Sequence, residues 1–155
     1  MGRIDYYHEQ NAPKATRIVP AVSAVIRNEQ QILLQQRSDN GKWALPGGNV
    51  DCGESVLEAI KREIREETGL EIIVDRISGV YSDPNHIIAY TDGEIRQQFS
   101  ICFAAESTGG LLHKSDESLA VSWVHIDKLD DYDIHPAQRV RIDDALQDRK
   151  SAFIR

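Results

Sequence analysis

The segment that begins at Glu54 or Ser55 and ends at Thr68 constrains the fold most, because it predicts an amphipathic helix with an unusual placement of charge. With Glu63 at zero on a wheel of about 100° per residue, Glu67 falls at about 40°. That position lies inside the apolar stripe, and Glu63 lies at its edge. The stripe spans roughly 20° to 120° and contains Val56, Leu57, Ile60 and Ile64. A helix with this stripe must pack on a sheet, so we expect its carboxylates to line a cleft at the margin of the core.

Glu66 falls just beyond Ala59 on the same wheel, so three glutamates gather at one end of the helix. Several anions packed at a core margin are costly unless a cation compensates them. Oxygen ligands of this kind suit Mg²⁺ or Mn²⁺. The alternative is a solvated acidic helix end, and the wheel alone does not decide between the two.

The rest of the chain predicts strands interrupted by helices. Residues 17–27 are β-branched and apolar, with Pro20 indicating an edge or a bulge, and residues 31–37 form the returning strand of a hairpin. We expect further elements at 43–45, 71–81, 86–90, 96–105 and 119–124 (strands) and at 136–146 (helix). This order predicts an α/β or α+β sandwich, a mixed sheet with helices packed on its faces. Residues 1–16 are expected to form an N-terminal arm or an added strand, and 17–155 one domain.

Charge and composition narrow the classes of partner. The chain has 18 basic and 25 acidic residues, a net charge of -7, and no basic run, which argues against nucleic acid and anionic membrane as partners. No apolar run approaches the roughly 20 residues of a membrane helix, and the N-terminus does not resemble a secretory signal. Cys52 and Cys102 lack metal-ligand spacing and are expected to be reduced and non-catalytic. We therefore expect a cytoplasmic protein.

The stretch from Gly48 to Leu70 has the spacing G-x5-E-x7-R-E-I-x-E-E-x-G-L. This pattern resembles the complete box of the Nudix hydrolases. The order of strands and helices over roughly 17–147 also resembles the α/β/α sandwich of that family. The resemblance implies Mg²⁺-dependent hydrolysis of a pyrophosphate bond in a nucleoside diphosphate linked to a group X, with Mn²⁺ as a possible substitute.

The resemblance also implies roles for single residues of the box. Expected metal ligands are the carbonyl of Gly48 and the carboxylates of Glu63, Glu66 and Glu67. Arg62 is expected to orient a ligating carboxylate, and Glu54 to act structurally or as an outer ligand. Pro46 and Gly47 are expected to let the loop fold tightly beside the phosphates. Two candidates for the general base remain open at this point, Glu66 in the box and Glu117 in a late loop.

The substrate is less constrained by the pattern. Arg37, at the end of a strand, is either a phosphate contact or a surface arginine, and Trp43 either a substrate contact or a core residue. Pro84 follows the box at about the distance that marks family members acting on ADP-ribose, although it also suits a plain turn. ADP-ribose or a nucleotide sugar is favoured. The alternatives are a nucleoside triphosphate pyrophosphohydrolase and, less favoured, a nucleotide-sensing domain without turnover. The polar arm suggests a homodimer.

Overall fold

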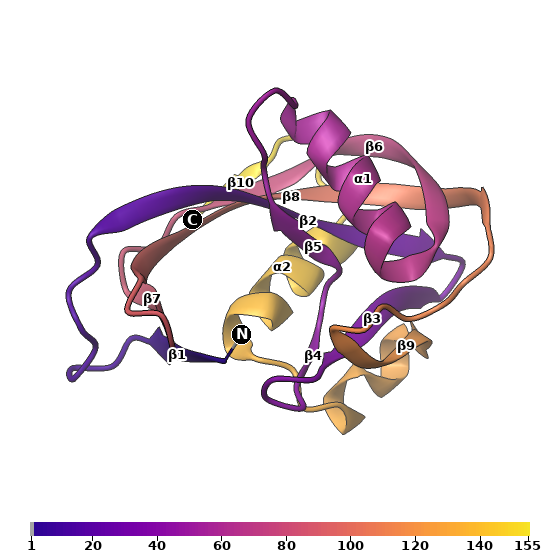
Figure 1. The fold of residues 1–155 in the computed structure, drawn as a ribbon. Coiled ribbons are helices and arrows are strands. Elements are labelled where there is room, and N and C mark those ends of the chain that lie inside the picture. The colour runs from indigo at the N-terminus through magenta and orange to yellow at the C-terminus, as the bar shows by residue number, and fades with distance from the viewer. Residues whose placement is uncertain (1) are drawn as a thin grey trace.

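One mixed sheet runs through the centre of the molecule, and helices cover both of its faces (Figure 1). The computed structural model describes residues 2–155. Its strands are β1 Arg3–Tyr7, β2 Arg17–Asn28, β3 Gln31–Arg37, β4 Trp43–Ala44, β5 Gly47–Asn49, β6 Leu70–Tyr81, β7 His86–Tyr90, β8 Ile95–Gly110, β9 Ser118–His125 and β10 Phe153–Ile154. The helices are α1 Val56–Thr68, the 3-10 helix η1 Ile126–Asp131, and α2 Pro136–Leu146. The expected mixed α/β architecture is confirmed.

Strands β2 and β8 form the axis of the sheet. They are parallel neighbours over the whole ladder from Arg17 opposite Arg96 to Arg27 opposite Glu106. On its other side β8 pairs with β6 and β7, both antiparallel, and β1 adds to the outer edge of β7. Beyond β2 lie β3 and then β9 and β4. The N-terminal segment is therefore part of the sheet between residues 3 and 7.

Alternating residues of the central strands feed two separate cores. In β2, Ala24 and Ile26 face α1, whereas Val25 packs on the side of α2 with Ile142. In β3, Leu33 faces α1 while its two neighbours face α2. Apolar residues on both faces are what a strand covered by helices on two sides requires. Each buried isoleucine or leucine contributes roughly 1.5–3 kcal/mol by leaving water.

Helix α1 has a defined start and end. Ser55 caps it: its hydroxyl accepts from the Glu58 amide, and the Glu58 carboxylate accepts from the Ser55 amide. Gly69 ends it with a φ of 77°, a conformation that favours glycine. Ile60 and Ile64 are fully buried, as the wheel predicts. Leu57 is 43% exposed, so the prediction that it packs on the sheet is wrong. It lies at the edge of the apolar stripe, beyond the part of the helix surface that the sheet covers.

Three local features differ from expectation. The expected break at Gly47 is a short strand, β5, which pairs with β2 from Ala21 to Ser23. Strand β2 consequently has partners on both sides and is not an edge strand. Pro20 lies just beyond the β5 ladder, where its carbonyl accepts from the Val50 amide. Its missing N–H points to the same side as this carbonyl, away from β8, so the proline removes no hydrogen bond to β8. Strand β8 continues through Gly110, expected to be loop, because β6 pairs with it there.

Within residues 2–155, no helix is long and apolar enough to cross a membrane.

The capping box gives a first prediction. Ser55→Ala removes the acceptor for the Glu58 amide and should destabilise the protein by about 1 kcal/mol. The thermal midpoint should fall by about 2–4 °C, measured by circular dichroism. Ser55→Thr retains a hydroxyl at the cap and serves as the control. Equal midpoints for the alanine variant and the natural protein would contradict this role of Ser55.

Candidate active site

A cleft of about 420 Å³ opens where α1, β5 and the ends of β3 and β9 meet. It is bounded by residues from distant parts of the chain, namely Arg3, Gln35, Arg37, Ser38, Asp39, Gly47, Gly48, Asn49, Asp51, Glu63, Glu67, Tyr90, Glu117 and Ser118. Pairing of β5 with β2 holds Gly47 and Gly48, here called the glycine loop, against the C-terminal half of α1. The fold thus brings six of the residues singled out in the sequence to one cleft: Arg37, Gly47, Gly48, Glu63, Glu67 and Glu117.

Glu67 is the most constrained carboxylate in this cleft. Its Oε2 accepts from the Gly47 amide at 2.9 Å and from the Gln35 side chain at 2.9 Å. Gln35 is fixed in turn by Ser118, whose hydroxyl donates to Gln35 Oε1 at 3.0 Å. Burial raises the pKa of Glu67 to about 8, and the carboxylates of Glu63 and Glu117 add to the rise. At neutral pH this group is either protonated or neutralised by a cation.

Glu63 lies directly against the backbone of Gly48. A Cβ atom at position 48 would come within 2.5 Å of the Glu63 carboxyl carbon, so a larger residue there would displace this carboxylate. A Cβ atom at Gly47 would collide with the carbonyl oxygen of Val22. Burial raises the pKa of Glu63, although the neighbouring Arg62 opposes this rise. The two glycines therefore allow the backbone and two partly buried carboxylates to share one wall.

Arg62 connects the carboxylates of the box to one another. Its guanidinium lies 2.6 Å from Glu54 Oε1, 2.9 Å from Glu63 Oε1 and 3.2 Å from Glu66 Oε2. It also donates to the carbonyl of Asn49 at 3.0 Å. The hydrogen bond from Arg62 lowers the pKa of Glu54 to about 2. Arg62 thus fixes the rotamer of Glu63. Arg62 itself and Glu66, whose side chain is 60% exposed, lie outside the lining of the cleft.

Two further candidate residues lie on the rim opposite α1. The carbonyl of Glu117 accepts from both the amide and the hydroxyl of Ser38, at 3.2 and 2.8 Å, so its backbone is anchored. Its exposed side chain lines the cleft near enough to Glu67 to raise that pKa. Arg37 makes two hydrogen bonds to Asp39, at 2.9 and 2.6 Å. These residues supply one acid and one oriented cation to the rim.

Three residues expected to contact substrate lie outside the lining of this cleft. Trp43 packs edge-on against Tyr132 with ring centres 5.1 Å apart. Pro46 is buried, and its carbonyl accepts from the Ala24 amide. Pro84 is exposed in the turn between β6 and β7, beside a separate hollow near Pro13.

Sequence reasoning missed Gln35, Arg3 and Tyr90. Gln35 had a usable signal, because it is a polar residue that continues the buried run of β3. Arg3 and Tyr90 had none, since they reach the cleft only through the pairing of β1 with β7, where Arg3 lies opposite Tyr90.

The donor set of the cleft fits a hard divalent cation. It consists of carboxylate oxygens and backbone, and burial makes its two inner carboxylates costly to ionise without a positive charge. A second group, Asp5, His86 and His135, has potential ligand atoms within 4.8 Å of one another. There, however, Arg3 already lies 3.0 Å from Asp5, and His135 Nδ1 accepts from the Ala137 amide. The glutamate cleft is therefore the better cation site.

Comparison with known proteins agrees with this geometry. A family model described as "NUDIX domain" matches residues 17–145. The chain is 32% identical over 128 residues to a "MutT-like protein" of Streptomyces ambofaciens, covering 83% of this chain and 76% of that protein. It is 38% identical to an "ADP-ribose pyrophosphatase" of Methanocaldococcus jannaschii, covering 70% of this chain and 63% of that protein. It is 35% identical to "Nucleoside triphosphatase NudI" of Salmonella paratyphi B, covering 76% and 89%.

A solved structure shows the same fold at lower sequence identity. An ADP-ribose pyrophosphatase of Streptococcus suis superposes with a TM-score of 0.70 at 22% identity, covering 88% of this chain and 98% of that one. Nudix enzymes are hydrolases that generally use divalent metal ions. The box, the fold and the matched relatives lead to one conclusion: this chain belongs to the Nudix family of hydrolases.

Proposed function

We propose that this enzyme hydrolyses a pyrophosphate bond in a nucleoside diphosphate linked to X, with Mg²⁺ as cofactor and ADP-ribose or a nucleotide sugar as the favoured substrate. The observation that carries the proposal is the partly buried Glu67, which accepts from the Gly47 amide and lies one helical turn from Glu63, itself against Gly48. A relative named ADP-ribose pyrophosphatase supports the choice of substrate.

The residues of the cleft have distinct parts in this reaction. Glu63, Glu67, the outer Glu66 and the carbonyl of Gly48 would hold Mg²⁺. The metal would supply positive charge to the phosphates and lower the pKa of a bound water. Arg62 keeps Glu63 in position. Arg37, on the rim, is placed to compensate the charge of a substrate phosphate.

The proton of the attacking water requires a base. Glu117 and Glu66 both remain candidates, and we favour Glu117. Its side chain lines the cleft opposite the carboxylates of α1, whereas Glu66 is already paired with Arg62.

Several expectations stay predictions. They are substrate contacts by Trp43, Pro46 and Pro84, a homodimer, a cytoplasmic location, and the division into an arm of residues 1–16 and a domain of residues 17–155. Light scattering at micromolar concentration would test the dimer.

A second hypothesis is that the enzyme is a nucleoside triphosphate pyrophosphohydrolase, which the name of the relative "Nucleoside triphosphatase NudI" favours. A panel of nucleotides incubated with Mg²⁺, with the products resolved by chromatography, separates the two. AMP and ribose 5-phosphate would identify ADP-ribose as the substrate, whereas a nucleoside monophosphate and pyrophosphate would identify a triphosphate. Binding without any product from the panel would overturn both and favour a sensing domain.

Glu67→Gln should separate metal binding from folding. Because the pKa of Glu67 is raised to about 8 in the folded protein, metal-free natural protein should lose stability as pH rises from about 4.5, the unfolded pKa, to about 8. The glutamine variant lacks this titration. In EDTA at pH 9 it should be more stable by about 2–5 kcal/mol, a rise in midpoint of at least about 4 °C.

Added Mg²⁺ should reverse this order, since it stabilises only the protein with all its ligands. The turnover of Glu67→Gln should fall by on the order of a hundredfold or more. Glu71→Gln changes an exposed acid paired with Arg65 and is the control for charge alone. Near-normal turnover of Glu67→Gln at saturating Mg²⁺ would rule out Glu67 as a ligand.

Glu117→Gln tests the base. A base acts in the chemical step, so kcat should fall by roughly ten- to a thousandfold while KM changes little. The acidic limb of the pH–rate profile should disappear. The neighbouring exposed acid gives a matched control, because Asp116→Asn changes the same loop charge outside the lining of the cleft. If Glu66→Gln removes the limb and Glu117→Gln leaves it intact, the base lies on α1.

A further inference from the structure

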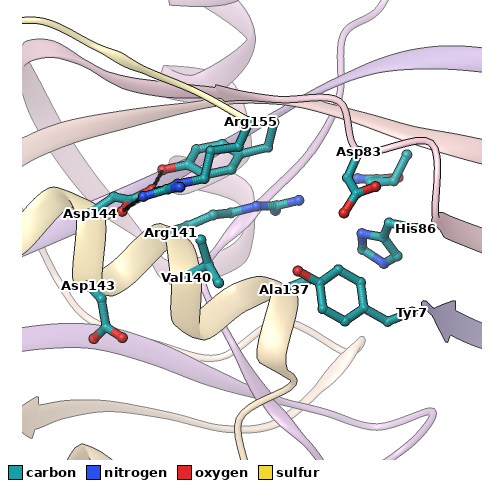
Figure 2. A pocket seen from close by; sticks show the side chains of 11 residues that line it. Tyr7, Asp83, His86, Ala137, Val140, Arg141, Asp143, Asp144 and Arg155 are labelled. Atoms are coloured by element: carbon teal, nitrogen blue, oxygen red, sulfur yellow. Dashed lines mark hydrogen bonds and ion pairs between the residues drawn. The ribbon is translucent and has the colours of Figure 1, made fainter.

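A second cavity, of about 430 Å³, lies between α2 and the strands of the sheet on the face opposite α1 (Figure 2). Tyr7, Tyr81, Ala137 and Val140 form its less polar walls. Its polar lining includes Arg141, which projects from α2 into the space that Figure 2 shows. The cavity is large enough for a sugar or a similar group, and none of the catalytic roles above uses it.

Arg141 is a buried cation without a counter-ion. Its residue surface is only 3% exposed, and its buried Nε has no hydrogen-bond partner. Among residues 2–155, no carboxylate lies within ion-pair distance of its guanidinium. The Tyr81 ring lies 5.4 Å away, and Asp5, which Arg3 already holds at 3.0 Å, acts on Arg141 only at longer range. Burial lowers the pKa of Arg141, yet an arginine stays protonated in proteins. A charge in this state is costly to bury and is compensated only by an anion or a strong acceptor.

The acids around the cavity do not compensate this charge, because each has another partner. Asp144 accepts two hydrogen bonds from Arg155, at 2.9 and 3.0 Å, and one from the Tyr81 hydroxyl at 2.8 Å. Asp143 pairs with Arg139 at 2.9 Å. Asp83 lies 2.6 Å from the imidazole of His8. Arg141 is therefore the charge left over in the lining.

The cavity and the catalytic cleft are neighbours, because a smaller hollow between them shares lining residues with both. Arg141, His86 and Gln98 border the cavity and also a smaller hollow of about 100 Å³. Arg37, Gly47 and Gly48 border that hollow and the cleft. This arrangement places Arg141 on the side of the cleft toward which a substituent of a bound ligand would have to extend.

We propose that this cavity is an anion-binding subsite in which Arg141 pairs with a phosphate or carboxylate group on the X part of the substrate. The inference deepens the proposed function and, for the X group, rests on it. Three observations support it: the guanidinium has no ion-pair partner, the nearby acids are held by other residues, and the cavity neighbours the cleft. A free anion of the same chemistry would bind Arg141 as well, and the experiment below distinguishes the two sources.

The binding test uses metal-free protein in EDTA, so it does not depend on turnover. Thermal unfolding is measured against inorganic phosphate for the natural protein, Arg141→Met and Arg65→Met. Arg65 is an exposed helix arginine paired with Glu71 and is the matched control. Phosphate should raise the midpoint of the natural protein and of Arg65→Met. In Arg141→Met the apparent affinity for phosphate should fall at least tenfold.

The same variant separates a binding role from a structural one. Removing an uncompensated buried charge while keeping its bulk should leave the phosphate-free midpoint unchanged or raise it. If Arg141→Met retains the phosphate response, the anion binds elsewhere and the proposal is overturned. If Arg141→Met does not fold, Arg141→Lys replaces it: loss of more than half of the midpoint shift supports a specific guanidinium contact, and a full response overturns the proposal.

The source of the anion is decided by steady-state kinetics with Mg²⁺. Nucleotide sugars that carry a carboxylate on the sugar are compared with their neutral counterparts. A lower KM for the carboxylated sugar, lost in Arg141→Met, places the anion on X. Equal KM values with competitive inhibition by phosphate, again lost in Arg141→Met, assign the subsite to a free anion and overturn the placement on X. Absence of turnover with every substrate would count against the proposed function but leave the EDTA result standing.

Discussion

The hydrogen bond from the Gly47 amide to Glu67 is the interaction on which the site depends. It joins the glycine loop to the helix that follows it, and it places a carboxylate where solvent no longer stabilises its charge. Three other contacts meet at this point. Pairing of β5 with β2 positions the Gly47 amide. Gln35, held by Ser118, donates to the same carboxylate, and Glu63 lies against Gly48. Burial and the nearby carboxylates make the charge of Glu67 costly, and the hydrogen bonds from Gly47 and Gln35 offset only part of that cost. A cation bound here would offset the rest.

Much of this arrangement could be predicted from the sequence, because it depends on residues close together along the chain. The extent of the helix, from Glu54 or Ser55 to Thr68, and the inward position of Glu67 follow from the helical period over a short segment. The β-branched, apolar runs likewise predicted strands, and their order along the chain predicted helices on the faces of a sheet. Leu57 shows the limit of such reasoning, because a wheel gives the direction of a side chain but not how far the sheet extends beneath it.

The residues of the cleft that could not be predicted are brought there by pairing between strands far apart in the sequence. Arg3 and Tyr90 reach the cleft because β1 lies beside β7, and nothing near either residue signals that contact. Arg141 lies on a helix whose sequence shows no obvious binding pattern. Its lack of an ion-pair partner appears only in the assembled structure, where Tyr81 and Arg155 both donate to Asp144. Burial and unmet charge are properties of the assembled structure.

The parallel ladder of β2 and β8 has a consequence for how the molecule folds. Strands so far apart in sequence close a long loop before their contacts yield any stabilisation, whereas β6 and β8 lie closer along the chain. Helix α1 and the glycine loop both lie within the loop that this ladder closes, and the two core layers form against its faces. We therefore expect the carboxylates of α1 to meet Gln35, Glu117 and the glycines of β5 late in folding, so that a bound metal would slow unfolding more than it accelerates folding.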